Sequence, residues 1–391
     1  MRCVALAEVG ISMVKRYAPL VVNRELSHSL DAVRRKDLDG DDAKQELARL
    51  LQAGLRLEFA TIPVYLSAAF SLGDNNKAIR NLITRVAIEE MLHFIIIANT
   101  MNAIGQPPDI EAAVPSFPFD LDILEPALHL ELKSYSPELV EQLFLRIETP
   151  RNPILFEAKL AAAPKTVGEF YEGIIQVIES EQIPGLFDID PATRNAAIIP
   201  DPPAFRPIAY RDDGDQGTYP IPGSIDFAIN DSASAARHLK WLVDQGEGTS
   251  RTDTDPIDLS GLPAHYYRFV SILKGRYLIE DGGTELGFSY SGGSLPFDPG
   301  ELHECDPNPR VADYAGRQRL LVQMKRFTDA YSRMIDALKT AFNSPDPAAA
   351  KAAYDISIGN MRGMLDLAQA IYRAAVREGV KGGVPFERTA E

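Results

Sequence analysis

Residues 77–105 constrain the fold of this chain more than any other segment. The run KAIRNLITRVAIEEMLHFIIIANTMNAIG predicts one long helix, and its final glycine, followed by Gln106-Pro107-Pro108, marks the end. Its middle is apolar on nearly every face, which is typical of a helix buried among others. Two ionisable residues, Glu90 and His93, lie in that apolar middle. The sequence therefore predicts a mainly α-helical protein with a carboxylate and an imidazole in its core.

Glu90 and His93 form an E-x-x-H motif, which puts both side chains on one face of the helix, one turn apart. Helix-bundle di-iron and di-manganese proteins bind metal ions with this motif and with glutamates from neighbouring helices. A buried ionised carboxylate without a partner is costly, and a dication removes that cost. The alternatives are an exposed Glu near a surface His and a buried Glu–His or Glu–Arg hydrogen bond, for which Arg85 is available. Glu89 is expected to point elsewhere, towards a polar neighbour.

Glu58 lies in an equally apolar setting, in a helix predicted from about Asp41 to Leu72. Pro63 falls inside this helix and is expected to kink it or to be absorbed by a local distortion. The turn at Gly73 makes this helix an antiparallel neighbour of the next. Glu58 lies about 15 residues before the turn and Glu90 about 17 after it, so a rise of 1.5 Å per residue brings both to nearly one level.

The second half of the metal site is expected from two later helices. Thr166 and Glu169 form a capping box that opens TVGEFYEGIIQVIESEQ, in which Glu172 is the candidate ligand. Glu179 and Glu181 remain alternatives to Glu172. A further helix, from Pro263, offers the imidazole of His265.

A second E-x-x-H motif would need a glutamate at position 262, where the chain has Leu262. Glu247, in the loop before that helix, is expected to supply the missing carboxylate. The alternatives are that Glu247 is an ordinary turn residue and His265 a surface histidine. The predicted metal ligands are Glu58, Glu90, His93, Glu172, Glu247 and His265.

Carboxylates and imidazoles without a thiolate favour iron, with manganese as the alternative. We expect two ions, and occupancy by one remains open. Tyr65, Tyr171 and Tyr266 stand beside predicted ligands and are the candidate catalytic residues. They could donate hydrogen bonds to the ligands, relay radicals, or simply pack in the core with a satisfied hydroxyl.

Composition excludes several classes of function. The net charge of -15 repels nucleic acid and anionic membrane surfaces. Two cysteines make no disulfide framework and no cysteine-based zinc site. No apolar run approaches the ~20 residues that span a bilayer. Without a convincing secretory leader, a cytoplasmic location is expected.

The chain is expected to form one elaborated helical domain rather than two independent ones. Residues 1–40 are an N-terminal extension. Residues 41–276 form the metal-binding bundle, with insertions at 107–163 and 184–230. Residues 277–391 form a β-turn segment and C-terminal helices that pack on the bundle.

Several segments together resemble the ferritin-like domain of iminophenyl-pyruvate dimer synthase, an enzyme type of the violacein pathway. They are LEFATIPVYLSA, AIEEMLHFIIIANTMNAIGQPP, GEFYEGI, DQGEGT, AHYYRF, YSGGSLPFDP and GVPFER, and they span roughly residues 40 to 390. The resemblance implies a ferritin-like four-helix bundle with a non-haem metal site, and it supports the six ligands named above. It also implies oxidative coupling of amino-acid-derived imino acids in natural-product assembly. The domain is part of a much longer chain in those enzymes, so residues outside it can set the substrate.

The expected function is therefore a non-haem di-iron oxidoreductase that uses O2 or peroxide on a small amino-acid-derived substrate. The alternative is ferroxidase or iron-handling activity without an organic substrate, and a metal-free structural bundle is a third hypothesis. The expected partners are the substrate and either a second copy of the chain or other pathway enzymes.

Overall fold

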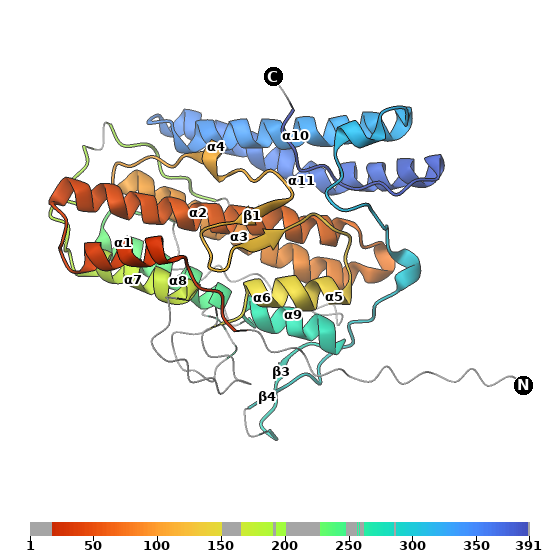
Figure 1. The fold of residues 1–391 in the computed structure, drawn as a ribbon, viewed down its shortest axis with the longest axis horizontal. Helices are drawn as coiled ribbons and strands as arrows, with labels where there is room; N and C mark the ends of the chain where they lie inside the picture. Colours follow the sequence, from red (N-terminus) through yellow and green to blue (C-terminus); the bar gives the residue numbers. More distant parts are fainter. Residues whose placement is uncertain are drawn as a thin grey trace, which may run out of the picture.

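Two long antiparallel helices, α2 (Gly40–Phe70) and α3 (Lys77–Ala103), form the centre of the protein (Figure 1). The computed structural model describes residues 18–150, 166–190, 193–200, 227–247, 256, 258, 262–284 and 287–389. A short 3-10 turn, η1 (Asp74–Asn76), joins the two helices. Pro63 lies inside α2 without ending it. The predicted hairpin is therefore present, and the mainly α-helical class is confirmed.

Shorter helices lie beneath this hairpin in two groups (Figure 1). The segments α5 (Pro137–Leu139), η2 (Val140–Phe144) and α6 (Leu145–Ile147) form one continuous helical run that packs against α9 (His265–Lys274). Beside them, α7 (Val167–Glu179) packs against α8 (Ser232–Glu247). Each of the two remaining positions of a four-helix bundle is thus filled by two helices in succession. The breaks fall between α6 and α7 and between α8 and α9.

Local sequence signals explain several of these boundaries. Thr166 accepts from the backbone N–H of Glu169, and the Glu169 carboxylate accepts from the N–H of Thr166, so the predicted capping box is confirmed. The first described helix, α1 (Arg24–Arg34), begins at Arg24 because the side chain of Asn23 caps it. A further short helix, α4 (Ile110–Ala113), follows α3.

A small antiparallel hairpin, β1 (Phe119–Leu121) and β2 (Leu128–Leu130), lies over the central helices. Its side chains alternate, so Leu128 and Leu130 point inward while His129 is exposed. The exposed His129 Nδ1 lies 2.7 Å from the Asp120 carboxylate on the neighbouring strand. An isolated bridge from Val22 to Leu124 ties the start of the described chain to this hairpin.

The C-terminal part forms a second helical hairpin on the opposite side of α2 and α3 (Figure 1). It follows a two-stranded segment, β3 (Ile279–Glu280) with β4 (Phe288–Ser289), and two 3-10 turns, η4 (Pro299–Glu301) and η5 (Val311–Tyr314). Its helices are α10 (Gln318–Phe342) and α11 (Pro347–Glu378). The ring of Phe342 meets that of Phe94 on α3 edge-on, with centroids 5.7 Å apart.

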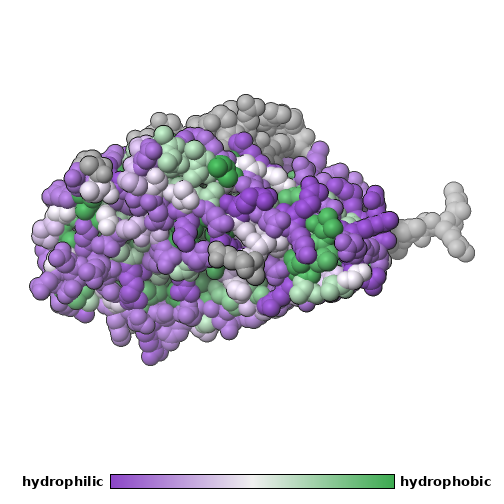
Figure 2. Space-filling view, turned by 90° about the horizontal axis from the view of Figure 1, so that it is seen from above, coloured by the Kyte–Doolittle hydropathy of each residue, from purple (hydrophilic) through white to green (hydrophobic). Residues whose placement is uncertain are grey.

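The surface on this C-terminal side is mostly hydrophilic with small apolar patches (Figure 2). Among the described helices, none combines the length and apolar character needed to cross a membrane. The division of the chain at residues 40 and 276 stays a prediction.

We expect Gly54→Ala to destabilise the protein, although alanine normally favours a helix interior by roughly 1 kcal/mol. A Cβ at Gly54, in the middle of α2, would lie 2.9 Å from the Tyr171 hydroxyl and 3.1 Å from its ring. Tyr171 is buried and cannot move aside freely. Overpacking of this kind costs about 1–3 kcal/mol, which urea unfolding can measure. Gly359→Ala on α11 is the control: with nothing within 4 Å, it should stabilise the protein, and equal effects at both sites would contradict this account.

Candidate metal centre

Five buried ionisable side chains converge between the α2–α3 hairpin and the shorter helices. They form two groups, and within each group the potential ligand atoms all lie within 4.8 Å of one another. The first group is Glu58, Glu90 and His93. The second is Glu90, Glu148 and His265. Glu90 belongs to both, so the groups form one cluster with a shared carboxylate.

The first group joins the two central helices. His93 Nδ1 lies 3.3 Å from Glu58 Oε2 and 3.2 Å from Glu90 Oε2. All three side chains are buried. Glu58 and Glu90 therefore meet at the same level of the hairpin, as the number of residues between each of them and the turn predicts.

The second group forms where the shorter helices are interrupted. Glu148 is the residue after the end of α6, and His265 is the first residue of α9. His265 Nδ1 lies 3.0 Å from Glu90 Oε1 and 3.3 Å from Glu148 Oε2. Both breaks in the bundle therefore lie at the level of the cluster, and each delivers a side chain to it.

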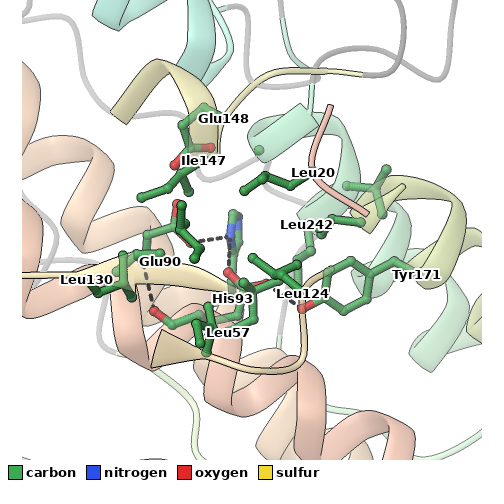
Figure 3. A pocket seen from close by; sticks show the side chains of 17 residues that line it. Leu20, Leu57, Glu90, His93, Leu124, Leu130, Ile147, Glu148, Tyr171 and Leu242 are labelled. Atoms are coloured by element: carbon green, nitrogen blue, oxygen red, sulfur yellow. Dashed lines mark hydrogen bonds and ion pairs between the residues drawn. The ribbon is translucent and has the colours of Figure 1, made fainter. Parts of the chain in front are cut away.

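The two oxygens of Glu90 face different imidazoles: Oε2 faces His93 and Oε1 faces His265. The two rings are nearly parallel, with their centroids 5.6 Å apart. A carboxylate in this position can bridge two cations, one beside each imidazole. Figure 3 shows Glu90, His93 and Glu148 directed towards a common space.

A tyrosine holds each of the other two carboxylates. The Tyr171 hydroxyl donates to Glu58 Oε1, and the Tyr65 hydroxyl donates to Glu148 Oε1. Both tyrosines are buried, and burial together with the nearby Glu148 raises the pKa of Tyr65 well above its ordinary value. Tyr65 therefore stays a donor at neutral pH. In each case the second carboxylate oxygen, Oε2, is the one that faces the cluster.

The Nε2 atom of each imidazole points away from the cluster to a hydrogen-bond acceptor. His93 Nε2 lies 3.2 Å from the amide oxygen of Gln245, and His265 Nε2 lies 2.7 Å from Glu89 Oε2. Because both partners accept through oxygen, each Nε2 carries the proton and each Nδ1 is left for a metal ion.

Buried charges behind His265 hold Glu89 in place. Arg268 donates to Glu89 through Nη1 at 2.6 Å, and its Nη2 lies 3.3 Å from Asp258. Arg85 lies 3.6 Å from the other Glu89 oxygen. Burial opposes ionisation of Glu89, but Arg268 and His265 outweigh it and lower its pKa to about 2. The expected polar neighbour of Glu89 is therefore this set of groups, and Arg85 faces Glu89 rather than Glu90.

Without metal, the cluster holds protons that a cation would displace. Burial, with the charge of Glu90 beside it, raises the pKa of Glu58 to about 8. Burial alone would lower the pKa of His93, but Glu90 and Glu58 outweigh it and raise the value to about 10. Burial likewise opposes protonation of His265, yet Glu148 and Glu89 raise its pKa. At pH 7, protons thus occupy the places between the carboxylates.

A cavity of about 50 Å³ adjoins the cluster. Glu58, Glu90, His93 and Glu148 line one side of it. Thr61, Tyr171 and a set of aliphatic side chains line the rest, and the aliphatic ones come mainly from the N-terminal segment, the β-hairpin and α8 (Figure 3). They include Leu20, Leu121, Leu124, Leu128, Leu130, Leu242 and Val243. The hairpin therefore covers the cluster with an apolar roof.

The residues fit a metal pair. The donor set consists of carboxylate oxygens and imidazole nitrogens, which suits iron or manganese. Among the described residues, the buried Nδ1 of His265 has no hydrogen bond of good geometry, despite the two nearby carboxylates. A buried polar atom without a well-oriented hydrogen bond is rare, and a cation between Nδ1 and the two carboxylates would satisfy it.

Comparison with known proteins bears on this arrangement. The family model described as ferritin-like matches residues 51–274, which is more than half of the chain. This chain belongs to the ferritin-like family.

Two individual proteins are similar to this ferritin-like chain. A dichlorochromopyrrolate synthase from Lentzea aerocolonigenes is 23% identical over 400 residues, covering 88% of this chain but only 36% of that protein. The chain therefore spans about a third of the length of its curated relative. A crystal structure of a ferritin-like protein from Caulobacter vibrioides is 19% identical, with a TM-score of 0.46, and the match covers 88% of this chain and 97% of that one.

The ferritin-like bundle brings together most, but not all, of the residues singled out in the sequence. Glu58, Glu90, His93 and His265 all lie in the cluster. Glu172 does not, so the expectation that it would join the site is wrong. It is exposed on α7, because the inward-facing residue at that level is the adjacent Tyr171, and the next position on a helix turns outward. Its alternatives fare no better: Glu179 pairs with Lys240 at the surface, and Glu181 is exposed.

Two further predicted residues stand apart. Glu247 is the last residue of α8, and its side chain lies outside the described residues; the preceding Gly246 lines the cavity. Its role as a ligand stays a prediction. Tyr266 is buried against the ring of Tyr267, at a centroid distance of 5.2 Å, and does not line the cavity as Tyr171 does.

Glu148 and Gln245 are the residues that sequence reasoning missed. Glu148 falls on the same helical face as the buried Val140 and Phe144, at spacings of four residues, and this was the available signal. Treating residues 107–163 as an insertion obscured it. Gln245 carries no comparable signal, because a glutamine near the end of an amphipathic helix is ordinary.

We expect metal binding to release protons, and apparent affinity to rise with pH. At pH 7 both His93, with a pKa of about 10, and Glu58, with a pKa of about 8, hold protons that a cation must displace. Affinity should therefore fall as pH drops below 7, by about tenfold per unit for each proton released. Calorimetric titration with Mn²⁺ in buffers of different ionisation enthalpy measures the number of protons released per bound ion. Binding with no proton release would contradict these protonation states.

Proposed function

We propose that this chain is a non-haem di-iron oxidoreductase that uses O2 or peroxide to oxidise a small amino-acid-derived substrate. The observation that carries the proposal is the shared carboxylate of Glu90, with one oxygen turned to each of two buried imidazoles. The proposed ligands are Glu58, Glu90, His93, Glu148 and His265, with Glu247 as a sixth. Manganese remains the alternative metal.

Each residue of the cluster has a defined task in this proposal. Glu58 and His93 would hold one ion, Glu148 and His265 the other, and Glu90 both. Tyr171 and Tyr65 fix the terminal carboxylates through one oxygen, so that each offers its other oxygen to a metal ion. The bound pair would pass two electrons from the substrate to O2 or peroxide. These residues would offer each ion one imidazole, one terminal carboxylate and one oxygen of Glu90, which would leave room for substrate or oxidant.

Charge favours an anionic group on the substrate. Three carboxylates neutralise three of the four positive charges of two dications, so one charge is left for Glu247 or for a bound anion. Among the described residues that line the cavity, none is a lysine or an arginine. A substrate carboxylate would therefore bind the metal pair, and an aromatic or aliphatic side chain would pack against the leucines of the roof. Apolar walls of this kind also exclude water from reactive species.

The relationship to a biosynthetic enzyme supports an organic substrate. The similar protein from Lentzea aerocolonigenes is a dichlorochromopyrrolate synthase, and this chain matches only part of it. We propose oxidative coupling of imino acids in natural-product assembly as the reaction, in line with the resemblance to the iminophenyl-pyruvate dimer synthase type. A cytoplasmic location and association with a second copy or other pathway enzymes belong to the same proposal.

We expect the purified protein to bind about two equivalents of Fe²⁺ under anaerobic conditions, and His93→Ala to bind about one. Glu90→Gln should impair both positions, because each uses one Glu90 oxygen. Metal analysis after gel filtration measures the content. Glu172→Ala is the matched control: this glutamate is exposed, so two equivalents should remain. Loss of metal in Glu172→Ala, or its retention in Glu90→Gln, would refute the ligand set.

O2 consumption by the iron-loaded protein separates the proposed enzyme from its alternative. An oxidoreductase should deplete an imino acid, generated from an aromatic amino acid by an amino-acid oxidase, and should consume O2 or H2O2 in proportion to it. A ferroxidase should instead consume O2 in proportion to added Fe²⁺ and leave the imino acid unchanged. Protein carrying Glu90→Gln serves as the background in both assays.

A further inference from the structure

The two proposed metal positions have the same kinds of ligand. We call Glu90, Glu148 and His265 the inner position, and Glu58, Glu90 and His93 the outer position. Each has one imidazole Nδ1, one oxygen of Glu90 and one terminal carboxylate that a tyrosine holds by its other oxygen. The difference lies behind the imidazoles.

At the inner position, His265 Nε2–H donates to a carboxylate, Glu89 Oε2, at 2.7 Å. At the outer position, His93 Nε2–H donates to an amide, Gln245 Oε1, at 3.2 Å. A carboxylate is a stronger hydrogen-bond acceptor than an amide, so its hydrogen bond to the imidazole is shorter. The stronger bond raises the electron density, and so the basicity, of Nδ1. The carboxylate-backed imidazole is therefore the better metal ligand.

The inner acceptor is also held more firmly. Glu89 is fully buried and is fixed by Arg268, which is itself held by Asp258 and by the Pro263 carbonyl. Since Pro263 lies two residues before His265, the same arginine fixes the start of α9. The inner imidazole is thus placed before any metal arrives, which lowers the entropy that binding must offset.

The outer position, whose imidazole has the weaker acceptor, is the one that faces the cavity more fully. His93, Glu58 and Glu90 line the cavity, whereas His265 does not, and the His265 side chain has no exposed surface. An ion at the outer position would therefore have its imidazole and its terminal carboxylate both facing the space that receives small molecules. An ion at the inner position would have only carboxylates on that side.

We propose that the two positions are inequivalent: the inner one binds metal first and retains it, and the outer one binds weakly, exchanges, and meets the substrate. This inference rests on the proposed di-metal function and deepens it. Glu89 acts here as a positioning residue for His265, and Gln245 sets the lower affinity of the outer position.

Anaerobic titration with Co²⁺ tests the inequivalence directly, with bound metal counted by equilibrium dialysis and the environment of each ion followed by visible absorption. The wild-type protein should show two classes of site, one ion each, that differ by at least about tenfold in affinity. His93→Ala should keep the tight class and lose the weak one. His265→Ala should do the reverse.

Two substitutions exchange the acceptors. Glu89→Gln should weaken the tight class by about 10- to 100-fold and leave the weak class nearly unchanged. Gln245→Glu should strengthen the weak class and narrow the gap between the two. Gln176→Glu adds the same charge at an exposed position on α7, beside Arg34, and should change neither class. Because Glu89→Gln leaves Arg268 less well paired, circular dichroism must show that it folds, and the Gln245→Glu result decides the matter if it does not.

The outcomes separate this inference from the function on which it rests. Two ions of equal affinity in the wild type would overturn the inequivalence and leave the di-metal function standing. A tight class that survives in His265→Ala but not in His93→Ala would also overturn it. A wild-type protein that binds no Co²⁺, Fe²⁺ or Mn²⁺ would overturn both proposals.

Discussion

The burial of the Glu90 carboxylate in the apolar middle of α3 is the constraint on which the rest of the structure depends. An ionised carboxylate at that depth needs compensating charge on both oxygens, and it has an imidazole on each. Burial opposes ionisation of Glu90, but the two imidazoles outweigh it and lower its pKa. Those imidazoles in turn need acceptors at Nε2, which Gln245 and Glu89 provide. The polar groups of the core thus follow from one another, starting from a single residue of α3.

The part of the site that the sequence predicts is the part that lies within one helical hairpin. Glu58, Glu90 and His93 follow from helical periodicity and from the short turn at Gly73, because the two helices are continuous and their rise per residue is fixed. Their meeting point could be calculated without any knowledge of the rest of the chain. The pairing of Glu89 with a polar neighbour followed from the same periodicity, since adjacent residues on a helix point about 100° apart.

The other half could not be predicted in this way, because its helices are not continuous. The choice of Glu172 assumed an unbroken third helix with its ligand in the middle. In the structure Glu148, which lies in the cluster, precedes the break, and Tyr171 after the break donates a hydrogen bond to Glu58 instead. His265 could be named as a candidate ligand although no E-x-x-H glutamate accompanies it. The reason for the missing glutamate lies in the tertiary structure: the fourth helix restarts at His265 itself, so position 262 is outside the helix.

The two breaks in the bundle have a consequence for how such a scaffold can diversify. The connections from α6 to α7 and from α8 to α9 leave and re-enter the bundle at residues that border the cavity or belong to the cluster. The two helices of the hairpin that carries Glu58, Glu90 and His93 are not interrupted at this level. Exchange or lengthening of either connection could therefore alter the edge of the cavity without moving the residues of the hairpin. Under the proposed function, new substrates could be acquired by altering the two connections, while one pair of uninterrupted helices would keep the metal ligands in place.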